Sequence, residues 1–142
     1  MKKYKQTIIP ETSTKEWRGM SAFATRKKMF DYYSTHYSGT KKVRNQSLNI
    51  LIAFDRIGAK KTSFGGHIYP KKACLVEVLD DLLRYAEYNN WGERKASDTS
   101  NVVGFFNFKA KVYIDGKMEY VHLVVILRND ASFHYSLEIN VW

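Results

Sequence analysis

The feature that most constrains the fold is the dipeptide Asp115-Gly116, which interrupts a long alternating segment. Residues 105–114 alternate apolar with polar side chains, residues 119–127 are strongly apolar, and residues 133–142 alternate again. An Asp-Gly pair between such segments is typical of a two-residue β-hairpin turn, because both of its residues tolerate positive φ. The sequence therefore predicts a three-stranded antiparallel meander in this part of the chain.

A two-residue turn also fixes which side chains lie opposite one another. Ile114 then faces Lys117, and the pairing runs back to place Phe108 opposite Leu123. With a five-residue loop over residues 128–132 before the last strand, one face of the meander becomes apolar. We expect this face to form the core, and it carries Phe106, Phe108, Ala110, Val112, Val121, Leu123, Val125, Phe133, Tyr135, Leu137 and Ile139.

The elements before the meander follow from capping residues and periodicity. Residues 13–16 (Ser-Thr-Lys-Glu) have the spacing of a capping box, which predicts a helix from there to about residues 33–37. Residues 48–54 predict a short apolar strand, and a loop rich in glycine and lysine follows over residues 58–67. A second, long helix is expected from Pro70 to about Asn90, covering the apolar face of the meander.

These elements predict one α+β domain over residues 1–142, in which the helices pack on one face of a sheet. Its order is an N-terminal helix, a strand, a long helix and a three-stranded antiparallel meander. Cys74 is the sole cysteine, which excludes an internal disulfide and indicates a reducing compartment. We expect a cytoplasmic site of action, no signal peptide and no membrane span, with export by another route left open.

Basic residues are concentrated in the first 61 residues, which hold 14 Lys and Arg against 4 Asp and Glu, while the whole chain carries a formal net charge of +9. Such asymmetry favours a polyanionic partner, because each neutralised phosphate releases counterions. Charge on solvated helices, serving solubility alone, is the alternative. The residues predicted to bind RNA are Arg26, Lys27, Lys28, Lys41, Lys42, Arg44, Lys60, Thr62 and Lys111.

The polar face of the predicted meander carries a candidate catalytic row. Under the register above, Lys109, His122 and Glu138 lie side by side on three neighbouring strands, within about 10 Å. RNA cleavage without metal requires a base for the ribose 2′-OH, an acid for the leaving 5′-oxygen and a cation for the transition state. Glu138, His122 and Lys109 suit these roles in that order, with Lys111 or Arg128 assisting. Favourable cross-strand charge pairing without catalysis is the alternative.

Two further predictions concern anions and metals. His67 follows Gly65-Gly66 just before a helix, with Lys61 nearby, so this segment is either an anion site or a basic loop with an incidental histidine. The four histidines show no metal-ligand spacing, and one cysteine cannot build a thiolate zinc site. We therefore expect neither metal nor cofactor.

The order of elements from about Arg26 to Trp142 carries a family resemblance. Its landmarks are a helix before Gly39, the strand at Leu48–Phe54, the turn at Arg56–Thr62, Gly65-Gly66-His67 before a long helix, Asn107–Val112 leading into Ile114–Lys117, the strand at Tyr120–Leu127 and a closing Phe133-His134-Tyr135. In this order the chain resembles a phage and prophage domain family related to the barnase–EndoU–colicin–RelE superfamily of ribonucleases. Residues 26–142 would form the ribonuclease-like region, after an N-terminal extension and helix start over residues 1–25.

The resemblance implies helical segments packed on a small antiparallel sheet, and metal-independent ribonuclease chemistry of the toxin or effector type. It also implies RNA as substrate and an acidic inhibitor or immunity protein as partner. By position, Lys61, Thr62 and His67 match places where the family often has polar residues. Where such families often have a histidine, this chain has Gly104-Phe105. The alternatives are therefore a non-catalytic module that binds RNA or an acidic protein, and a structural or regulatory phage protein.

Overall fold

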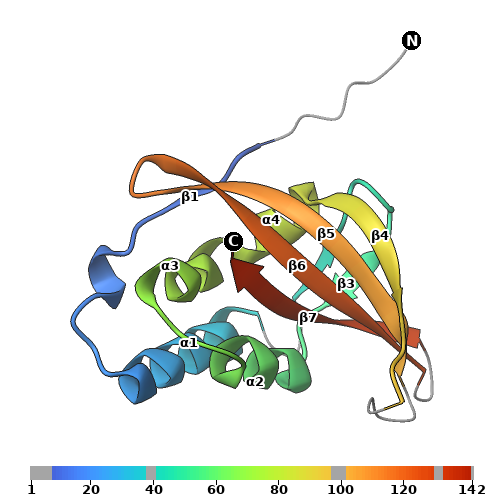
Figure 1. Cartoon of the computed structure of the whole chain (residues 1–142), viewed down its shortest axis with the longest axis horizontal. Helices are drawn as coiled ribbons and strands as arrows, with labels where there is room; N and C mark the ends of the chain where they lie inside the picture. The colour runs from blue at the N-terminus through green and yellow to red at the C-terminus, as the bar shows by residue number, and fades with distance from the viewer. Residues whose placement is uncertain (1–7, 38–40, 97–101, 130–132, 142) are drawn as a thin grey trace.

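The computed structural model describes residues 8–37, 41–96, 102–129 and 133–141. It confirms the predicted α+β class (Figure 1). The elements, in chain order, are β1 (Glu11–Thr12), the 3-10 turn η1 (Lys15–Trp17), α1 (Ala22–His36), β2 (Lys42–Arg44), β3 (Leu51–Ala53), α2 (Arg56–Phe64), α3 (Pro70–Ala73), the 3-10 segment η2 (Cys74–Val78), α4 (Leu79–Tyr85), β4 (Glu87–Glu93), β5 (Val102–Ile114), β6 (Lys117–Asn129) and β7 (Phe133–Val141).

The main sheet contains the predicted meander and two additional strands. β5, β6 and β7 pair antiparallel in sequence order. β4 and β1 both pair with β5, β4 antiparallel over residues 104–109 and β1 parallel at residues 113–114. β2 and β3 form a separate two-stranded sheet. The edge of β5 away from β6 is therefore shared by two strands, one at each end (Figure 1).

The Asp115-Gly116 turn has the predicted geometry. Both residues have positive φ, 52° and 79°, as a type I′ turn requires. Ile114 pairs with Lys117, and Phe108 pairs with Leu123, so the register predicted for the hairpin is confirmed.

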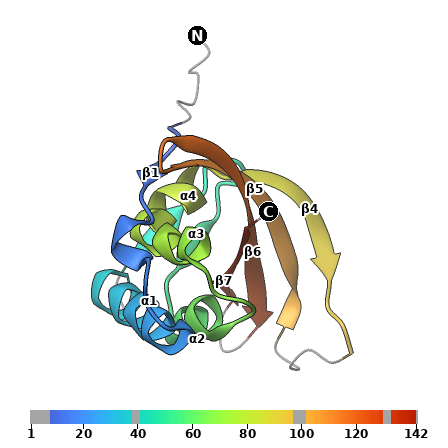
Figure 2. The same ribbon diagram turned by 60° about the vertical axis from the view of Figure 1, so that its left-hand side comes forward.

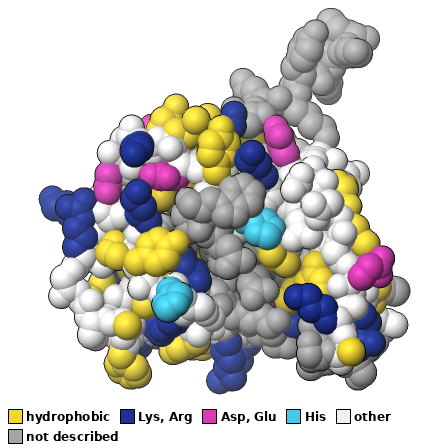
Figure 3. Space-filling model, in the orientation of Figure 1, with side chains coloured by type: hydrophobic (Ala, Val, Ile, Leu, Met, Phe, Trp, Pro, Cys, Tyr) yellow, Lys and Arg dark blue, Asp and Glu magenta, His cyan; other side chains and the backbone are white. Residues whose placement is uncertain are grey.

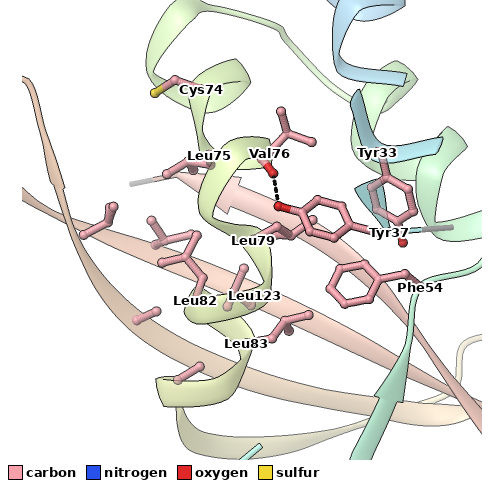
Figure 4. Packing of buried hydrophobic residues seen from close by; sticks show 14 of the residues in the cluster. Tyr33, Tyr37, Phe54, Cys74, Leu75, Val76, Leu79, Leu82, Leu83 and Leu123 are labelled. Atoms are coloured by element: carbon pink, nitrogen blue, oxygen red, sulfur yellow. Dashed lines mark hydrogen bonds between the residues drawn. The ribbon is translucent and has the colours of Figure 1, made fainter. Parts of the chain in front are cut away.

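The helices lie together on one side of the sheet, as predicted (Figure 2). The inner face of the hairpin buries Phe108 and Leu123, which belong to the same cluster as Leu79 and Leu83 of α4. Figure 4 shows this cluster and the stacked rings of Tyr37 and Phe54, whose centroids lie 4.7 Å apart. None of the helices in the described ranges has the length and hydrophobicity needed to cross a membrane.

The first helix begins later than predicted. α1 starts at Ala22, and the Oγ of Ser21 caps it by accepting the N–H of Ala24 at 3.1 Å. Gly19 has a φ of 74°, in the left-handed region, which interrupts any helix starting at Ser13. The predicted capping box over residues 13–16 is therefore wrong, whereas the predicted end of the helix is confirmed.

The predicted loop rich in glycine and lysine is largely a helix, α2. Ala59, Thr62 and Ser63 are buried. One side of this helix therefore faces the core, which the polar composition of the segment does not predict. Arg26 of α1 donates hydrogen bonds to the carbonyls of Ser63 and Gly66, at 3.1 and 2.5 Å. These bonds satisfy carbonyls at the C-terminal end of the helix.

The predicted long helix is a succession of three short segments, α3, η2 and α4, and it ends before Asn90. Pro70 begins it as predicted. The buried Asn45 donates its side-chain amide hydrogens to the carbonyls of Leu83 and Ala86, at 2.7 and 2.9 Å. This cap ends α4 and lets the chain turn into β4, a strand that the periodicity did not predict. The strand predicted over residues 48–54 forms in shortened form as β3.

Two tyrosines of the core provide a matched test of buried hydrogen bonding. The hydroxyl of Tyr37 donates to the carbonyl of Val76 at 2.6 Å, whereas the hydroxyl of Tyr33 is buried without a partner among the described residues. We expect Tyr37→Phe to lower the free energy of unfolding by about 1–2 kcal/mol, because a buried carbonyl loses its donor. Tyr33→Phe should leave it unchanged or raise it by up to about 1 kcal/mol. Urea unfolding measures both, and equal losses would contradict the assignment.

Candidate nucleic-acid interface

The predicted catalytic row is formed in part. Lys109 and His122 are direct cross-strand partners on β5 and β6, as predicted. On β7, however, His122 pairs with Asn140, and Glu138 pairs with Val124. The predicted register of β7 is wrong by two residues, because β6 continues to Asn129 and leaves three residues for the loop instead of five. The backbone of Glu138 therefore lies two residues, about 7 Å, from its predicted position opposite His122.

A different carboxylate, on β4, lies next to Lys109 on the side opposite His122. Glu87 of β4 pairs with Lys109, so Glu87, Lys109 and His122 occupy neighbouring positions on three strands. Glu87 and Lys109 are exposed and His122 is half-buried. Glu87 was missed because its segment was expected to be helical; the aromatic residues Tyr88 and Trp91 are the signal that favours a strand there.

Side-chain hydrogen bonds connect His122 of β6 to β5 and, through β5, to β4. Its Nε2 lies 3.0 Å from the Oδ1 of Asn107, and the Nδ2 of Asn107 donates to the Oδ1 of Asn90 at 2.9 Å. Because the amide nitrogen of Asn107 is the donor to Asn90, its oxygen faces the imidazole, and the Nε2 of His122 carries the hydrogen. This chain of contacts fixes the orientation of the ring.

A cleft of about 550 Å³ opens beside this row. Lys109, Lys111 and Tyr120 line it together with Glu87, and the Nζ of Lys109 lies 4.6 Å from the centroid of the Tyr120 ring. The remaining lining residues come from the segment before β1, from α4 and from β5: Ile8, Ile9, Pro10, Asp81, Leu82, Tyr85 and Ala110. Asp81 is paired with Arg84 at 2.5 Å.

Several basic residues predicted to bind RNA are engaged within the protein. Arg26 caps α2. Lys28 donates to the carbonyl of Glu16 and lies 4.3 Å from the Trp17 ring centroid. Lys41 pairs with Asp80 at 3.5 Å, and Arg44 donates to the carbonyl of Asn49 at 3.1 Å. These side chains hold α1 and β2 in place.

Other predicted residues divide between the surface and the core. Lys27, Lys42, Lys60 and Lys111 are exposed. Thr62 is fully buried, so the prediction that it binds RNA is wrong for this conformation. Figure 3 shows lysine and arginine side chains spread around the face in view instead of gathered in one patch.

The remaining predicted catalytic residues do not join Lys109 and His122. His67 is exposed in the connection between α2 and α3. Arg128 is 4% exposed and lies six residues from His122 along β6, about 20 Å away. The side chains of Lys61 and Glu138 lie outside the described part of the structure.

Gly104 is one of the two residues, Gly104-Phe105, that stand where the family resemblance implies a histidine. A Cβ atom at this position would lie 2.0 Å from the Cζ2 atom of Trp91. The indole ring therefore fills the space that any side chain at residue 104 would need. The packing of β4 on β5 therefore excludes a histidine at residue 104.

The described residues contain no group of three or more His, Cys, Asp or Glu side chains placed to hold a metal ion. Burial raises the pKa of the Cys74 thiol to about 12, so this cysteine does not supply a thiolate at neutral pH. The candidate chemistry in the described part of the chain thus rests on Glu87, Lys109 and His122.

Comparison with known proteins identifies a family. A family model described as large polyvalent protein-associated domain 3 matches residues 20–135. Comparison with curated proteins and with solved structures gave no match. The family match supports the phage-associated part of the predicted resemblance, and the relation to the ribonuclease superfamily stays a prediction.

Replacement of Gly104 tests whether Trp91 excludes a side chain there. We expect Gly104→Ala to lower the free energy of unfolding by about 1–3 kcal/mol, because the indole must shift from a packed position. In a Trp91→Ala background the same replacement should cost much less, so a double-mutant cycle should give a clear coupling energy. Additive effects in urea unfolding would show that the two residues do not compete for space.

Proposed function

The chain belongs to the large polyvalent protein-associated domain 3 family, and from this premise we propose that it is a phage- or mobile-element-encoded module that binds RNA on the outer face of its sheet. The observation that carries the proposal is the grouping of Lys109, Lys111 and Tyr120 beside the cleft. Lysines neutralise phosphates and release counterions, and a tyrosine ring gives bases a stacking surface. An RNA-binding role agrees with a cytoplasmic site of action.

The internal contacts of the N-terminal basic residues favour the sheet over α1 as the principal RNA contact. A phosphate that engaged Arg26 or Lys28 would compete with hydrogen bonds that hold α1 and α2 together. Lys109 and Lys111 are exposed, and binding there leaves those bonds intact. Exposed lysines elsewhere, such as Lys27 and Lys60, then contribute long-range attraction.

Charge removal at two matched places tests the binding surface. We expect Lys109→Ala with Lys111→Ala to weaken binding of a single-stranded RNA about tenfold or more. The slope of log affinity against log salt should fall by about 0.7 for each phosphate that is no longer neutralised. Lys27→Ala with Lys60→Ala removes the same charge from exposed helix positions, and should weaken binding about two- to threefold. Fluorescence anisotropy at several salt concentrations measures both.

Equal effects of the two double variants would contradict a specific surface and indicate attraction by net charge alone. Preference for an acidic protein over RNA would support the alternative partner. Tyr120→Ala separates these cases, because loss of a stacking ring weakens RNA binding and leaves binding to carboxylates largely unchanged.

Metal-independent RNA cleavage of the toxin or effector type is the second candidate, favoured by the row of Glu87, Lys109 and His122. Glu87 would take the proton of the ribose 2′-OH, whose oxygen attacks the phosphorus. The P–O5′ bond then breaks, and His122 protonates the leaving 5′-oxygen. Lys109, between them, would stabilise the charge of the transition state. The products are a 2′,3′-cyclic phosphate and a 5′-hydroxyl.

Two replacements in the row test cleavage. In the presence of EDTA, purified protein should convert RNA to fragments with cyclic-phosphate ends, and Glu87→Gln or His122→Ala should each lower the rate about 100- to 10,000-fold. Glu93→Gln on the same strand and His67→Ala are the controls and should retain the activity. Intact RNA that remains bound with salt-sensitive affinity would reject cleavage and keep the binding proposal.

A further inference from the structure

Among the described residues, the outer edge of β5 has a one-residue gap in its hydrogen bonding. β4 pairs with β5 up to Lys109, and β1 pairs from Tyr113 onward. Backbone groups alternate between the two edges of a strand, and the N–H of Tyr113 donates to the carbonyl of Pro10 at 2.9 Å. The N–H and C=O of Lys111, two residues earlier, therefore face the same outer edge, and no described strand pairs with them there.

The sequence explains why the carbonyl of Lys111 is unpaired. Continuing the parallel ladder of β1 by one step would require the N–H of residue 10 to donate to the carbonyl of Lys111. Residue 10 is proline, which has no N–H. On the other side, β4 begins at Glu87, because the chain enters it directly from Ala86 at the end of α4.

The residues on either side of this gap line the cleft described above. Lys111 and Pro10 both line this cleft, together with Tyr85, Tyr120 and Lys109. Its volume of about 550 Å³ lies within the roughly 300–1,000 Å³ of small-ligand sites. A backbone donor and acceptor, two aromatic rings and two lysines thus share one concave site.

We propose that this cleft binds one unpaired nucleobase, whose Watson–Crick edge hydrogen-bonds to the N–H and C=O of Lys111. Every base carries a neighbouring acceptor and donor on that edge, and proteins read splayed-out bases of single-stranded RNA by such bonds and by aromatic stacking. Tyr85 and Tyr120 supply rings, and Lys109 and Lys111 supply cations for the flanking phosphates. The inference rests on the proposed RNA binding and specifies its substrate as single-stranded.

An extended peptide is the other ligand that sheet edges attract, through strand addition. Strand addition depends on several consecutive residues with unpaired backbone groups. Here β4 and β1 already occupy the positions on either side, Lys109 and Tyr113. One residue of open edge suits a planar base better than a strand.

Two variants isolate the backbone groups. Lys111→Pro removes the N–H that faces the gap, which is not part of the β5–β6 ladder; Lys111→Ala is its control and keeps the N–H without the charge. Pro10→Ala restores an N–H at residue 10 that can donate to the carbonyl of Lys111 and so remove the acceptor of the site. It therefore tests the same site if Lys111→Pro fails to fold. Binding is measured with a 2′-O-methyl RNA 12-mer, which 2′-OH attack cannot cleave, as a single strand and as a duplex.

We expect wild type to bind the single strand about tenfold more tightly than the duplex, corresponding to two net hydrogen bonds. Lys111→Pro and Pro10→Ala should abolish this preference. In wild type and Lys111→Ala, one adenine or cytosine should be protected from dimethyl sulfate at its Watson–Crick nitrogen, and the protection should disappear in the other two variants.

The outcomes separate this inference from the proposed function. Equal binding of single strand and duplex, without protection of any base, overturns the nucleobase site and leaves RNA binding standing. Displacement of the RNA by an unstructured peptide but not by a mononucleotide overturns it in favour of strand addition. Failure to bind either RNA overturns the proposed function, and this inference with it.

Discussion

The structure depends on Asp115, which acts at once through its backbone and its carboxylate. Its φ of 52° forms the hairpin turn that sets the register of β5 and β6. Its carboxylate accepts hydrogen bonds from the hydroxyl and the N–H of Thr14, at 2.6 and 3.0 Å, and pairs with Arg18 at 3.2 Å. The bonds from Thr14 are the main reason that its pKa falls from 3.8 to about 2. Asp115 thus sets the register that decides which face is buried. It also holds the segment after β1 against the turn, and the segment before β1, residues 8–10, lines one side of the cleft.

The parts of the fold that were predictable are those that the chain specifies locally. The Asp115-Gly116 turn gave the hairpin register, and Pro70 gave the start of a helix, because turn and cap preferences act within a few residues. The parts that were not predictable depend on distant partners. The side chain of Asn45 caps α4 about forty residues further along the chain, and Arg26 caps α2. Neither the hydrophobic periodicity nor the composition of the sequence indicates these contacts.

The candidate site follows the same division. Lys109 and His122 could be paired from the sequence because the hairpin between them is local. The position of Glu138 was predicted wrongly because the register of β7 depends on the length of the preceding loop. The pairing of Glu87 with Lys109 was not predicted because it depends on where α4 ends. Counting charge located a basic N-terminal half, but the count cannot distinguish a lysine that meets solvent from an arginine that caps a helix.

The outer face of the sheet is itself divided, and this division limits where a polyanion can bind. Val102, Val124 and Ile126 form a second buried cluster, although Val124 and Ile126 lie on the same face of β6 as His122 by alternation. The unbroken apolar run from Leu123 to Leu127 is the sequence sign that β6 is covered on both faces there. Among the described side chains on this face of β5 and β6, the exposed lysines lie near the hairpin turn, where Lys109, Lys111 and Tyr120 line the cleft. A polyanion that binds β5 and β6 meets these lysines at that end, beside the unpaired backbone of Lys111.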